Sequence, residues 1–373
     1  MGNPIFYIES LQPLMKRYFL FILLLLFSSL KAEEIVTVSQ PVTVEIDGTF
    51  FSKPIITHNN LLVIASHNKY VYFFDSKGNL KNKFKAKSWF HATPAQLSDG
   101  RVALGSYDRR FYFFDADGNY LSYFKPNGFI FTNPVEFYGK IAFGMDFGRI
   151  GYYDLETGEI SKTKVRRLVH GSPMVTSDSI LVVGGNSKKV YFIDKNKKVT
   201  HKLKTKGMIM HSKAAELKNG TLIIGSYDNH LYNFDKAGCV IWKFKTGGSI
   251  HSQPIQMNDE NIVFGSMDGS VYIISPTGEL VNKIETSEKV ISSPCKLNDS
   301  VFMICSNNSH IYFIDSKGNI LGKHNAECGK IFSSPIVFPD GTVFFATRKG
   351  KLFFLPAEFV EELVTMNTNG TGS

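Results

Sequence analysis

A unit of about 40 residues recurs eight times between residues 51 and 355, and this repetition constrains the fold more than any other feature of the sequence. One copy contains the runs 225–228 (GSYD), 231–235 (LYNFD) and 242–244 (WKF), and the next copy opens with 251–254 (HSQP). A period of this length is typical of a supersecondary unit that buries its apolar face only by stacking on its neighbours. The repeat therefore predicts one domain built as an array of similar modules.

All copies but the eighth have the pattern of four short strands. In the second copy, apolar and aromatic residues gather in the runs 94–97, 101–105, 111–114 and 120–124, which Gly, Asp and Ser separate. Such runs, bounded by turn residues, are signals of strands joined by tight turns. Four antiparallel strands in about 40 residues are typical of a β-propeller blade.

A recurrent Asp-x-x-Gly pattern marks the turn before the fourth strand of several copies. The Asp side chain can accept hydrogen bonds from the turn backbone, and Gly supplies the positive φ that the turn requires. The pattern occurs at Asp75 and Gly78, Asp115 and Gly118, Asp235 and Gly238, and Asp315 and Gly318.

The eighth copy has no fourth strand of its own. It ends near residues 351–355, whereas the stretch 42–46 (VTVEI) precedes the first copy at the spacing of a fourth strand. We therefore predict an all-β, eight-bladed propeller that this N-terminal strand closes, because closure removes exposed sheet edges. Seven blades are the alternative if one copy is irregular. The copies begin near Phe51, His91, Phe131, His170, His211, His251, Ile291 and Phe332.

The N-terminal region has the pattern of a signal peptide. Lys16 and Arg17 precede an apolar run over residues 18–30, and small residues follow up to Ala32. This order predicts an exported protein cleaved after residue 32, and the run is short for a membrane span. An uncleaved anchor is the alternative, and Met15 is a second candidate for the start of the chain.

The rest of the chain divides into the propeller and a tail. A hydrophobic content of 43% excludes a disordered chain, and a closed repeat array over residues 33–356 counts as a single domain. Residues 357–373 are expected to form a polar tail, with a helical turn at 358–363 as its one regular element.

The formal net charge of +9 comes from scattered lysines rather than one basic segment. Alternating lysines are expected on the solvent face of outer strands, where they discourage edge-to-edge pairing. Docking onto an anionic surface or partner is the alternative. An exported chain is not expected to bind nucleic acid. The lysines concerned are Lys81, Lys83, Lys85, Lys87, Lys197, Lys198, Lys202, Lys204 and Lys206.

The chain has four cysteines, Cys239, Cys295, Cys305 and Cys328, and no CxxC motif or zinc-ligand spacing. Cys295 and Cys305 should lie on neighbouring strands of one hairpin. Two alternatives stay open there, a disulfide in an oxidising compartment or cysteines that act as small buried hydrophobes.

The unit Gly-Ser-x-Asp, Leu-Tyr-x-Phe-Asp, Gly, Trp, Ser-x-Pro resembles the pyrroloquinoline-quinone-like (PQQ-like) repeat of bacterial eight-bladed propellers. The resemblance covers almost the whole chain after the signal peptide and is specific for architecture. The family includes quinone-dependent dehydrogenases and the propeller lipoprotein of the outer-membrane β-barrel assembly machinery. The chain is similar to that lipoprotein in length, export and blade count, but no lipid-anchoring cysteine lies near residue 32.

The resemblance to the dehydrogenases implies a quinone, a calcium site, an adjacent cysteine pair and an aromatic floor. This chain has no adjacent cysteines, and Trp89 and Trp242 occupy positions within the blades. We therefore expect no bound quinone and no other cofactor.

One repeat position carries histidine in four copies and an apolar residue in the other four. Because the position begins the strand expected to be innermost, these side chains are predicted to surround one mouth of the central channel. Converging imidazoles can bind a transition metal or an anionic ligand, and packing between blades is the structural alternative. The candidates are His91, His170, His211 and His251.

Two further recurrent positions are expected to be structural. Asp108, Asp228 and Asp268 follow Gly-Ser in the turn, and Asn68 and Asn308 take the same place elsewhere, which favours turn capping over acid–base catalysis. A recurrent tyrosine is expected to pack between blades. It occurs at Tyr72, Tyr112, Tyr191, Tyr232, Tyr272 and Tyr312.

These observations favour an exported, non-catalytic propeller that acts as a protein-binding scaffold in the cell envelope. A rigid ring with variable loops provides such a surface. We expect a monomer with an envelope protein as its partner, and contact with a membrane only peripherally or through an uncleaved N-terminal anchor. The competing hypothesis is an enzyme with a metal or small-molecule site built on the histidine ring at the channel mouth.

Overall fold

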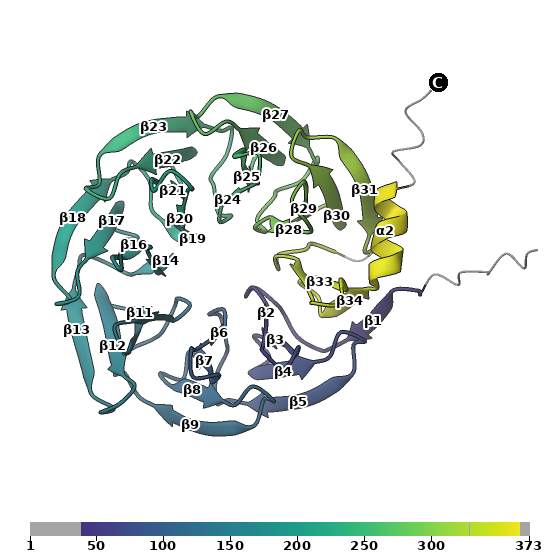
Figure 1. Ribbon diagram of the computed structural model, residues 1–373. Coiled ribbons are helices and arrows are strands. Elements are labelled where there is room, and N and C mark those ends of the chain that lie inside the picture. The colour runs from purple at the N-terminus through teal and green to yellow at the C-terminus, as the bar shows by residue number, and fades with distance from the viewer. Residues whose placement is uncertain (1–38, 328, 366–373) are drawn as a thin grey trace, which may run out of the picture. The chain divides into compact units, whose positions relative to one another are not determined.

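The computed structural model describes residues 39–327 and 329–365 (Figure 1). The expected signal peptide over 1–32, the alternative start at Met15, and Cys328 lie outside the described residues. Chain contacts separate residues 1–38 from a second unit, Ser39–Ser373, and the description below concerns that unit alone. No helix in the described ranges is long and apolar enough to cross a membrane.

Eight four-stranded antiparallel sheets surround a common axis as the blades of a propeller, as the repeat predicted (Figure 1). Blades 1 to 4 consist of β2 (Ile55–Ile56), β3 (Leu62–Ala65), β4 (Tyr70–Phe74) and β5 (Leu80–Lys85); β6 (Ala95–Gln96), β7 (Val102–Gly105), β8 (Phe111–Phe114) and β9 (Tyr120–Phe124); β10 (Val135–Phe137), β11 (Lys140–Met145), β12 (Arg149–Asp154) and β13 (Ile160–Lys164); and β15 (Met174–Val175), β16 (Leu181–Gly185), β17 (Lys189–Ile193) and β18 (Val199–Lys204).

The remaining blades follow the same order from the innermost strand outwards. Blades 5 to 8 consist of β20 (Ala215–Glu216), β21 (Leu222–Gly225), β22 (His230–Phe234) and β23 (Val240–Lys245); β24 (Ile255–Gln256), β25 (Ile262–Gly265), β26 (Ser270–Ile274) and β27 (Leu280–Glu285); β28 (Cys295–Lys296), β29 (Val301–Ser306), β30 (His310–Asp315) and β31 (Ile320–Asn325); and β32 (Ile336–Val337), β33 (Val343–Ala346), β34 (Lys351–Leu355) and β1 (Val42–Glu45).

The ring closes through β1, the N-terminal strand, as predicted. It pairs antiparallel with β34, and the register runs from Val42 opposite Phe354 to Glu45 opposite Lys351. Ile46 N–H continues the pairing by donating to the Gly350 carbonyl at 2.9 Å. Blade 8 therefore combines the first and the last strand of the described chain, and the eight-blade prediction is confirmed.

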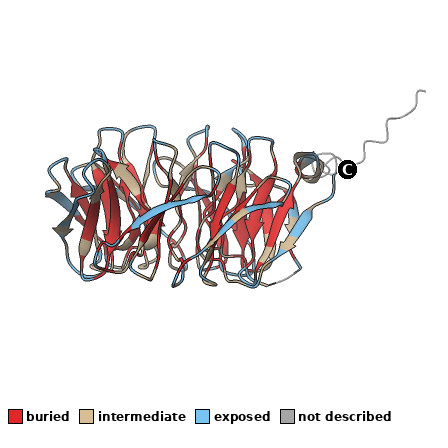
Figure 2. Ribbon diagram, turned by 90° about the horizontal axis from the view of Figure 1, so that it is seen from below, coloured by how far each residue is buried: buried red, intermediate tan, exposed pale blue. Residues whose placement is uncertain are grey.

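Apolar clusters between neighbouring blades form the core. All four residues of β3 are buried, whereas β5 exposes alternate residues, including Lys81, Lys83 and Lys85. Tyr112 of blade 2 belongs to the same buried cluster as Val63 and Phe73 of blade 1. In the side view, buried strands fill the middle of the ring and exposed ones its rim (Figure 2). The placement of the lysines and tyrosines agrees with the sequence predictions.

The turns between the third and fourth strands have the predicted chemistry. In the first blade, Asp75 Oδ1 accepts from the Lys77 and Asn79 N–H groups at 3.0 and 2.9 Å. Gly78 has a φ of 80°. This left-handed conformation is accessible to glycine at no steric cost.

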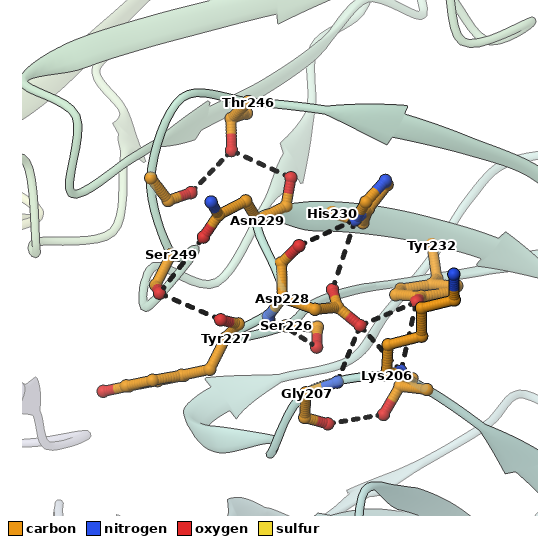
Figure 3. A network of polar contacts seen from close by, with 12 residues as sticks. Lys206, Gly207, Ser226, Tyr227, Asp228, Asn229, His230, Tyr232, Thr246 and Ser249 are labelled. Atoms are coloured by element: carbon orange, nitrogen blue, oxygen red, sulfur yellow. Dashed lines mark hydrogen bonds and ion pairs between the residues drawn. The ribbon is translucent and has the colours of Figure 1, made fainter.

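The recurrent aspartate of blade 5, Asp228, also links this blade to the one before it (Figure 3). Asp228 Oδ2 in blade 5 accepts from the Tyr232 hydroxyl at 2.8 Å, and from the Lys206 and Gly207 N–H groups after blade 4, both at 2.7 Å. Burial would raise the pKa of Asp228, but these hydrogen bonds hold it below its usual value. Burial and the bond to Asp228 raise the pKa of Tyr232 to about 12.

Asparagine makes the same link between blades, but its side chain donates the hydrogen bonds that aspartate accepts. Asn308 Nδ2 donates to the Thr286 carbonyl of the preceding blade and to the Tyr312 hydroxyl, both at 2.6 Å. Asn68 contacts the Asp47 carbonyl and Tyr72 in the same way. The recurrent Asp or Asn therefore joins blades as well as capping a turn, which explains why the residue recurs with the unit.

The C-terminal segment differs from the expected polar tail with one helical turn. Ala357–Thr365 forms the helix α2, nine residues long, next to β31 at the edge of blade 7 (Figure 1). Val360 is buried, and Phe359, Leu363 and Val364 pack against the cluster shared by blades 7 and 8. The helix is part of the fold because its apolar face packs on the blades. The polar residues of the segment led to the prediction of a tail.

The described cysteines are free. Cys295 lies opposite Met303 rather than Cys305, so the two thiols are not register partners. Cys305 is fully buried in the core, and burial raises the pKa of its thiol well above the usual value. Of the two alternatives, the structure has the buried hydrophobe at Cys305.

Candidate functional site

The innermost segment of each blade alternates between the channel and the blade core. In blade 6, Ser252 is buried, its hydroxyl donates to the Gly265 carbonyl at 3.2 Å, and it accepts from Gly265 N–H at 2.9 Å. This pair of hydrogen bonds holds Ser252 against the second strand, so the flanking residues, His251 and Gln253, face the channel. Ser292 and Ser333 make the same pair of bonds in blades 7 and 8.

Two rings of residues therefore line a cavity of about 240 Å³ in the channel. The upper ring is the repeat position that sequence analysis selected, and the lower ring lies two residues further along each copy. The upper ring consists of Phe51, His91, Phe131, His170, His211, His251, Ile291 and Phe332. The lower ring consists of Lys53, Thr93, Asn133, Ser172, Lys213, Gln253, Ser293 and Ser334.

Hydrogen bonds fix the lower ring from blade to blade. Thr93 Oγ1 accepts from Lys53 N–H, and Asn133 Oδ1 accepts from Thr93 N–H, both at 3.0 Å. Lys53 Nζ donates across the channel to Gln253 Oε1 at 3.3 Å. Within the described ranges, no Asp or Glu side chain lines the cavity.

The structure brings all four candidate histidines together in the upper ring. Potential ligand nitrogens of His91, His170 and His211 lie within 4.8 Å of one another. His251 stacks on His211, with ring centroids 4.5 Å apart and planes inclined by 24°. Among the described residues, the imidazoles of His91, His170 and His211 form the group that could hold a metal ion.

His170 has no hydrogen-bond partner in this cluster. Both of its ring nitrogens, Nδ1 and Nε2, are buried and unpaired. Phe131 lies edge-on to the ring at 5.2 Å, and His211 lies at 4.8 Å between centroids. A buried imidazole without any partner is costly, about 1–3 kcal/mol for an unsatisfied polar group.

A fifth histidine, His67, joins the cluster from a different part of the unit. It follows β3 in the hairpin turn of blade 1, and its Nε2 lies 3.0 Å from His91 Nδ1. Sequence reasoning missed this residue because its repeat position is chemically variable, with Tyr107, Tyr227 and Arg348 at equivalent places. The only signal available was a second histidine, 24 residues before His91.

The backbone departs from the repeat where two of the histidines lie. An extra strand in blade 4, β14 (His170–Ser172), pairs in parallel with β19 (Met210–Lys213), and the register shifts between His170 and Ser172. His211 has a φ of 61°, in the left-handed region. Non-glycine residues in that region are uncommon and are held there by their surroundings.

Burial keeps the imidazoles uncharged at neutral pH. It lowers the pKa of His170 to about 4 and that of His211 to about 2, and neighbouring histidines add to both effects. The pKa of His67 and that of His251 are also lowered to about 4, mainly by burial. Neutral imidazoles retain the lone pairs that bind metals.

The two channel lysines are also perturbed. Burial, with a contribution from Lys213, lowers the pKa of Lys53 to about 7, and burial lowers the pKa of Lys213. Both side chains are partly buried. The cavity is therefore rich in nitrogen but carries much less positive charge at pH 7 than its composition suggests.

A surface of aromatic rings and arginines borders the same mouth of the channel along blades 8, 1, 2 and 3. Arg348 lies over Phe51, which contacts His67, and His67 stacks on Trp89 at 5.4 Å. Tyr107 continues the row to Phe129, which Arg109 covers at 4.7 Å. In blade 3, Arg149 lies over Phe147 and pairs with Asp146, whose carboxylate accepts from Phe129 N–H at 3.3 Å. We call these residues the aromatic–arginine surface: Phe51, His67, Trp89, Tyr107, Arg109, Phe129, Phe147, Arg149 and Arg348.

Comparison with known proteins identifies the family. The family model described as outer membrane protein assembly factor BamB matches residues 146–353, more than half of the chain. The chain belongs to this family of PQQ-like repeat propellers. The resemblance noted from the sequence is thereby confirmed.

Solved structures agree on the architecture. The BamB propeller of Moraxella catarrhalis superposes with a TM-score of 0.71 at 13% identity, over 86% of this chain and 100% of that one. A computationally designed propeller, Ika8, has a TM-score of 0.71 at 15% identity, over 84% and 97% of the two chains. No curated protein sequence matches. At these identities the structural matches establish the fold.

Proposed function

We propose that this protein is an exported, non-catalytic scaffold of the cell envelope that binds another protein through its aromatic–arginine surface. The description of the family as an outer membrane protein assembly factor supports a role in an envelope assembly. The observation that carries the proposal is the exposure of large aromatic side chains on one rigid face. Phe147 is 79% exposed and Trp89 is 50% exposed.

The chemistry of this surface suits a protein partner. Aromatic residues and arginine are enriched in the central part of protein interfaces, where they supply most of the binding energy. The blades hold these side chains in place by stacking, so little freedom would be lost on binding. A ring of eight blades provides the rigid support.

The charge of the surface favours a partner segment that combines acidic and apolar side chains. Arg149 is paired with Asp146 at 3.1 Å. Among residues 39–327 and 329–365, neither Arg109 nor Arg348 forms an ion pair. Two guanidinium groups are therefore available to carboxylates of a partner, and the net charge of +9 would assist its approach.

The proposal is tested by capture from the cell envelope with matched variants. The double variant Trp89→Ala and Phe147→Ala removes the two most exposed rings of the surface. Leu280→Ala with Val281→Ala is the control, since those residues are 54% and 46% exposed on an outer strand. We expect one envelope protein to be retained by the wild type and the control, and lost by the surface variant. Equal capture by all three proteins would contradict the proposed docking face.

Export is tested separately by fractionation. We expect the mature protein in the envelope fraction, with Glu33 as its first residue if the segment 1–32 is cleaved. A protein found only inside the cell, with its N-terminus intact, would contradict this part of the proposal.

A further inference from the structure

We propose that His91, His170 and His211 together bind one divalent transition-metal ion of the zinc or copper class at the mouth of the channel. The three imidazoles come from blades 2, 4 and 5, and the side of the ion that faces the cavity would remain open for water. The three ligands are not part of the aromatic–arginine surface, and the metal site touches that surface through His67, which lies 3.0 Å from His91.

The spacing of the ligands fits an ion after a small closure. Zinc–imidazole bonds are about 2.0–2.1 Å long, so nitrogens in a tetrahedral site lie roughly 3.4 Å apart. The nitrogens of the three histidines already lie within 4.8 Å of one another. Side-chain rotations that move the ring nitrogens by roughly 1 Å would bring them to these distances.

The unpaired state of His170 points to a missing ligand. Its two ring nitrogens are buried without a hydrogen bond, although nearly all buried polar groups in proteins have a partner. Phe51, Phe131, Ile291 and Phe332 fill the same repeat position elsewhere. An apolar residue is therefore compatible with this position, and packing alone does not require imidazole at His170.

His67 and His251 support the three ligands from outside. A metal-binding histidine usually donates its second ring N–H to a neighbouring acceptor. His67 Nε2, 3.0 Å from His91 Nδ1, can accept that bond and leave His91 Nε2 free for the ion. His251 stacks against His211 and limits its rotation. His67 and His251 are thus positioning residues.

The donor set selects the class of ion. Imidazole nitrogens suit zinc, copper and nickel, whereas magnesium and calcium require oxygen ligands. No carboxylate from the described ranges lines the cavity. Lys53 and Lys213, in the ring below, oppose a cation while they are protonated, so binding must come from coordination rather than from net charge.

The test uses the full chain, purified without a histidine tag and freed of metal with a chelator. Titration calorimetry with Zn²⁺ and Cu²⁺ should show one site per chain, and Mg²⁺ and Ca²⁺ should show none. Co²⁺ should develop the visible absorption of a four-coordinate site with three imidazole nitrogens and one water. Absence of zinc and copper binding would overturn the proposal, as would binding of inorganic phosphate by the same cavity in their place.

Variants copied from the other blades keep the test independent of folding. His170→Phe reproduces a residue that occupies this ring position in other blades, so circular dichroism and melting should stay close to wild type. His211→Ile also copies a ring residue, but it places a β-branched side chain on the left-handed backbone of position 211, so a loss of stability is expected for that variant. Each should weaken Zn²⁺ binding at least tenfold. His67→Ala should weaken it less and preserve the one-to-one stoichiometry. His201→Phe is the control, because His201 is exposed on an outer strand. Full affinity in His170→Phe and His211→Ile would overturn the assignment.

Discussion

The links between blades and the lining of the channel differ in how closely their residues follow the repeat. The link residues recur from blade to blade, whereas the channel residues vary. At the links, Asp108, Asp228 and Asp268 each accept from the Tyr hydroxyl four residues later and from a backbone N–H of the segment that follows the preceding blade. Asn308 makes the corresponding contacts as a donor. In the upper ring, the same position is histidine in four blades and apolar in the other four. The positions that recur therefore carry contacts that stabilise the ring, whereas the position that varies is the one at which we propose a metal site.

Removing the strand that closes the ring should have the largest effect. Deletion of residues 39–46 would leave β34 with an unpaired edge and uncover the cluster that contains Phe354. We expect the free energy of unfolding to fall by more than ~4 kcal/mol, with aggregation through the exposed edge. Chemical denaturation and light scattering measure both. A soluble monomer of unchanged stability would show that closure contributes little.

Breaking one link between blades should cost less. Asp228→Ala would leave the buried Tyr232 hydroxyl and the Lys206 and Gly207 N–H groups without their acceptor. We expect a loss of about 2–3 kcal/mol by denaturant unfolding. Asp228→Asn should lose about 1 kcal/mol, because its amide oxygen can still accept one of these bonds. If both variants lost the same amount, the carboxylate would not be the group that joins the blades.

The histidines of the channel should make the free energy of unfolding depend on pH. The pKa of His170 and that of His211 are lowered in the folded, metal-free protein, so between pH 6.5 and about 4 only the unfolded chain binds these protons. Stability should therefore fall as the pH falls through this window, by at most about 1.4 kcal/mol per unit for each histidine and less where solvent reaches the ring. His170→Phe with His211→Ile should flatten the slope in urea titrations at pH 6.5 and pH 4.5. If the change of stability with pH were the same in this double variant, groups other than His170 and His211 would cause it.

The rim of the ring should be the most tolerant region. Lys81 forms an exposed ion pair with Asp75 at 3.0 Å, on the outer strand of blade 1. Lys81→Ala should change stability by no more than about 0.5 kcal/mol, because exposed ion pairs are weak and screened by salt. Thermal melting at low and high salt checks this. A loss above that limit would mean that outer strands contribute to the links between blades.

Most of the fold was predictable because its determinants are local. Strand runs such as 111–114, and turns such as Asp75 to Gly78, depend on residues a few positions apart, and the period repeats that information eight times. The helix α2 was underestimated because its apolar face, with Val360, gains stability only from the blade beneath it. A marginal helix takes most of its stability from such packing.

The candidate site was predictable only in part. The departure from the repeat identified His91, His170, His211 and His251, but it carried no information on distance. His67 was missed, because its repeat position shows no consistent chemistry and lies outside the innermost strand. The parallel pairing of β14 with β19 and the left-handed backbone of His211 have no counterpart in the other copies that would have signalled them.

The sequence by itself determined the number of blades, their strands and the strand that closes the ring, because period and turn chemistry act over short distances. Only the tertiary structure decided which side chains meet in the channel. That meeting depends on the curvature of the closed ring, which brings His91 and His211, 120 residues apart in the sequence, to a centroid distance of 5.3 Å. The same closure removes these imidazoles from water, lowers their pKa values and leaves His170 without a partner.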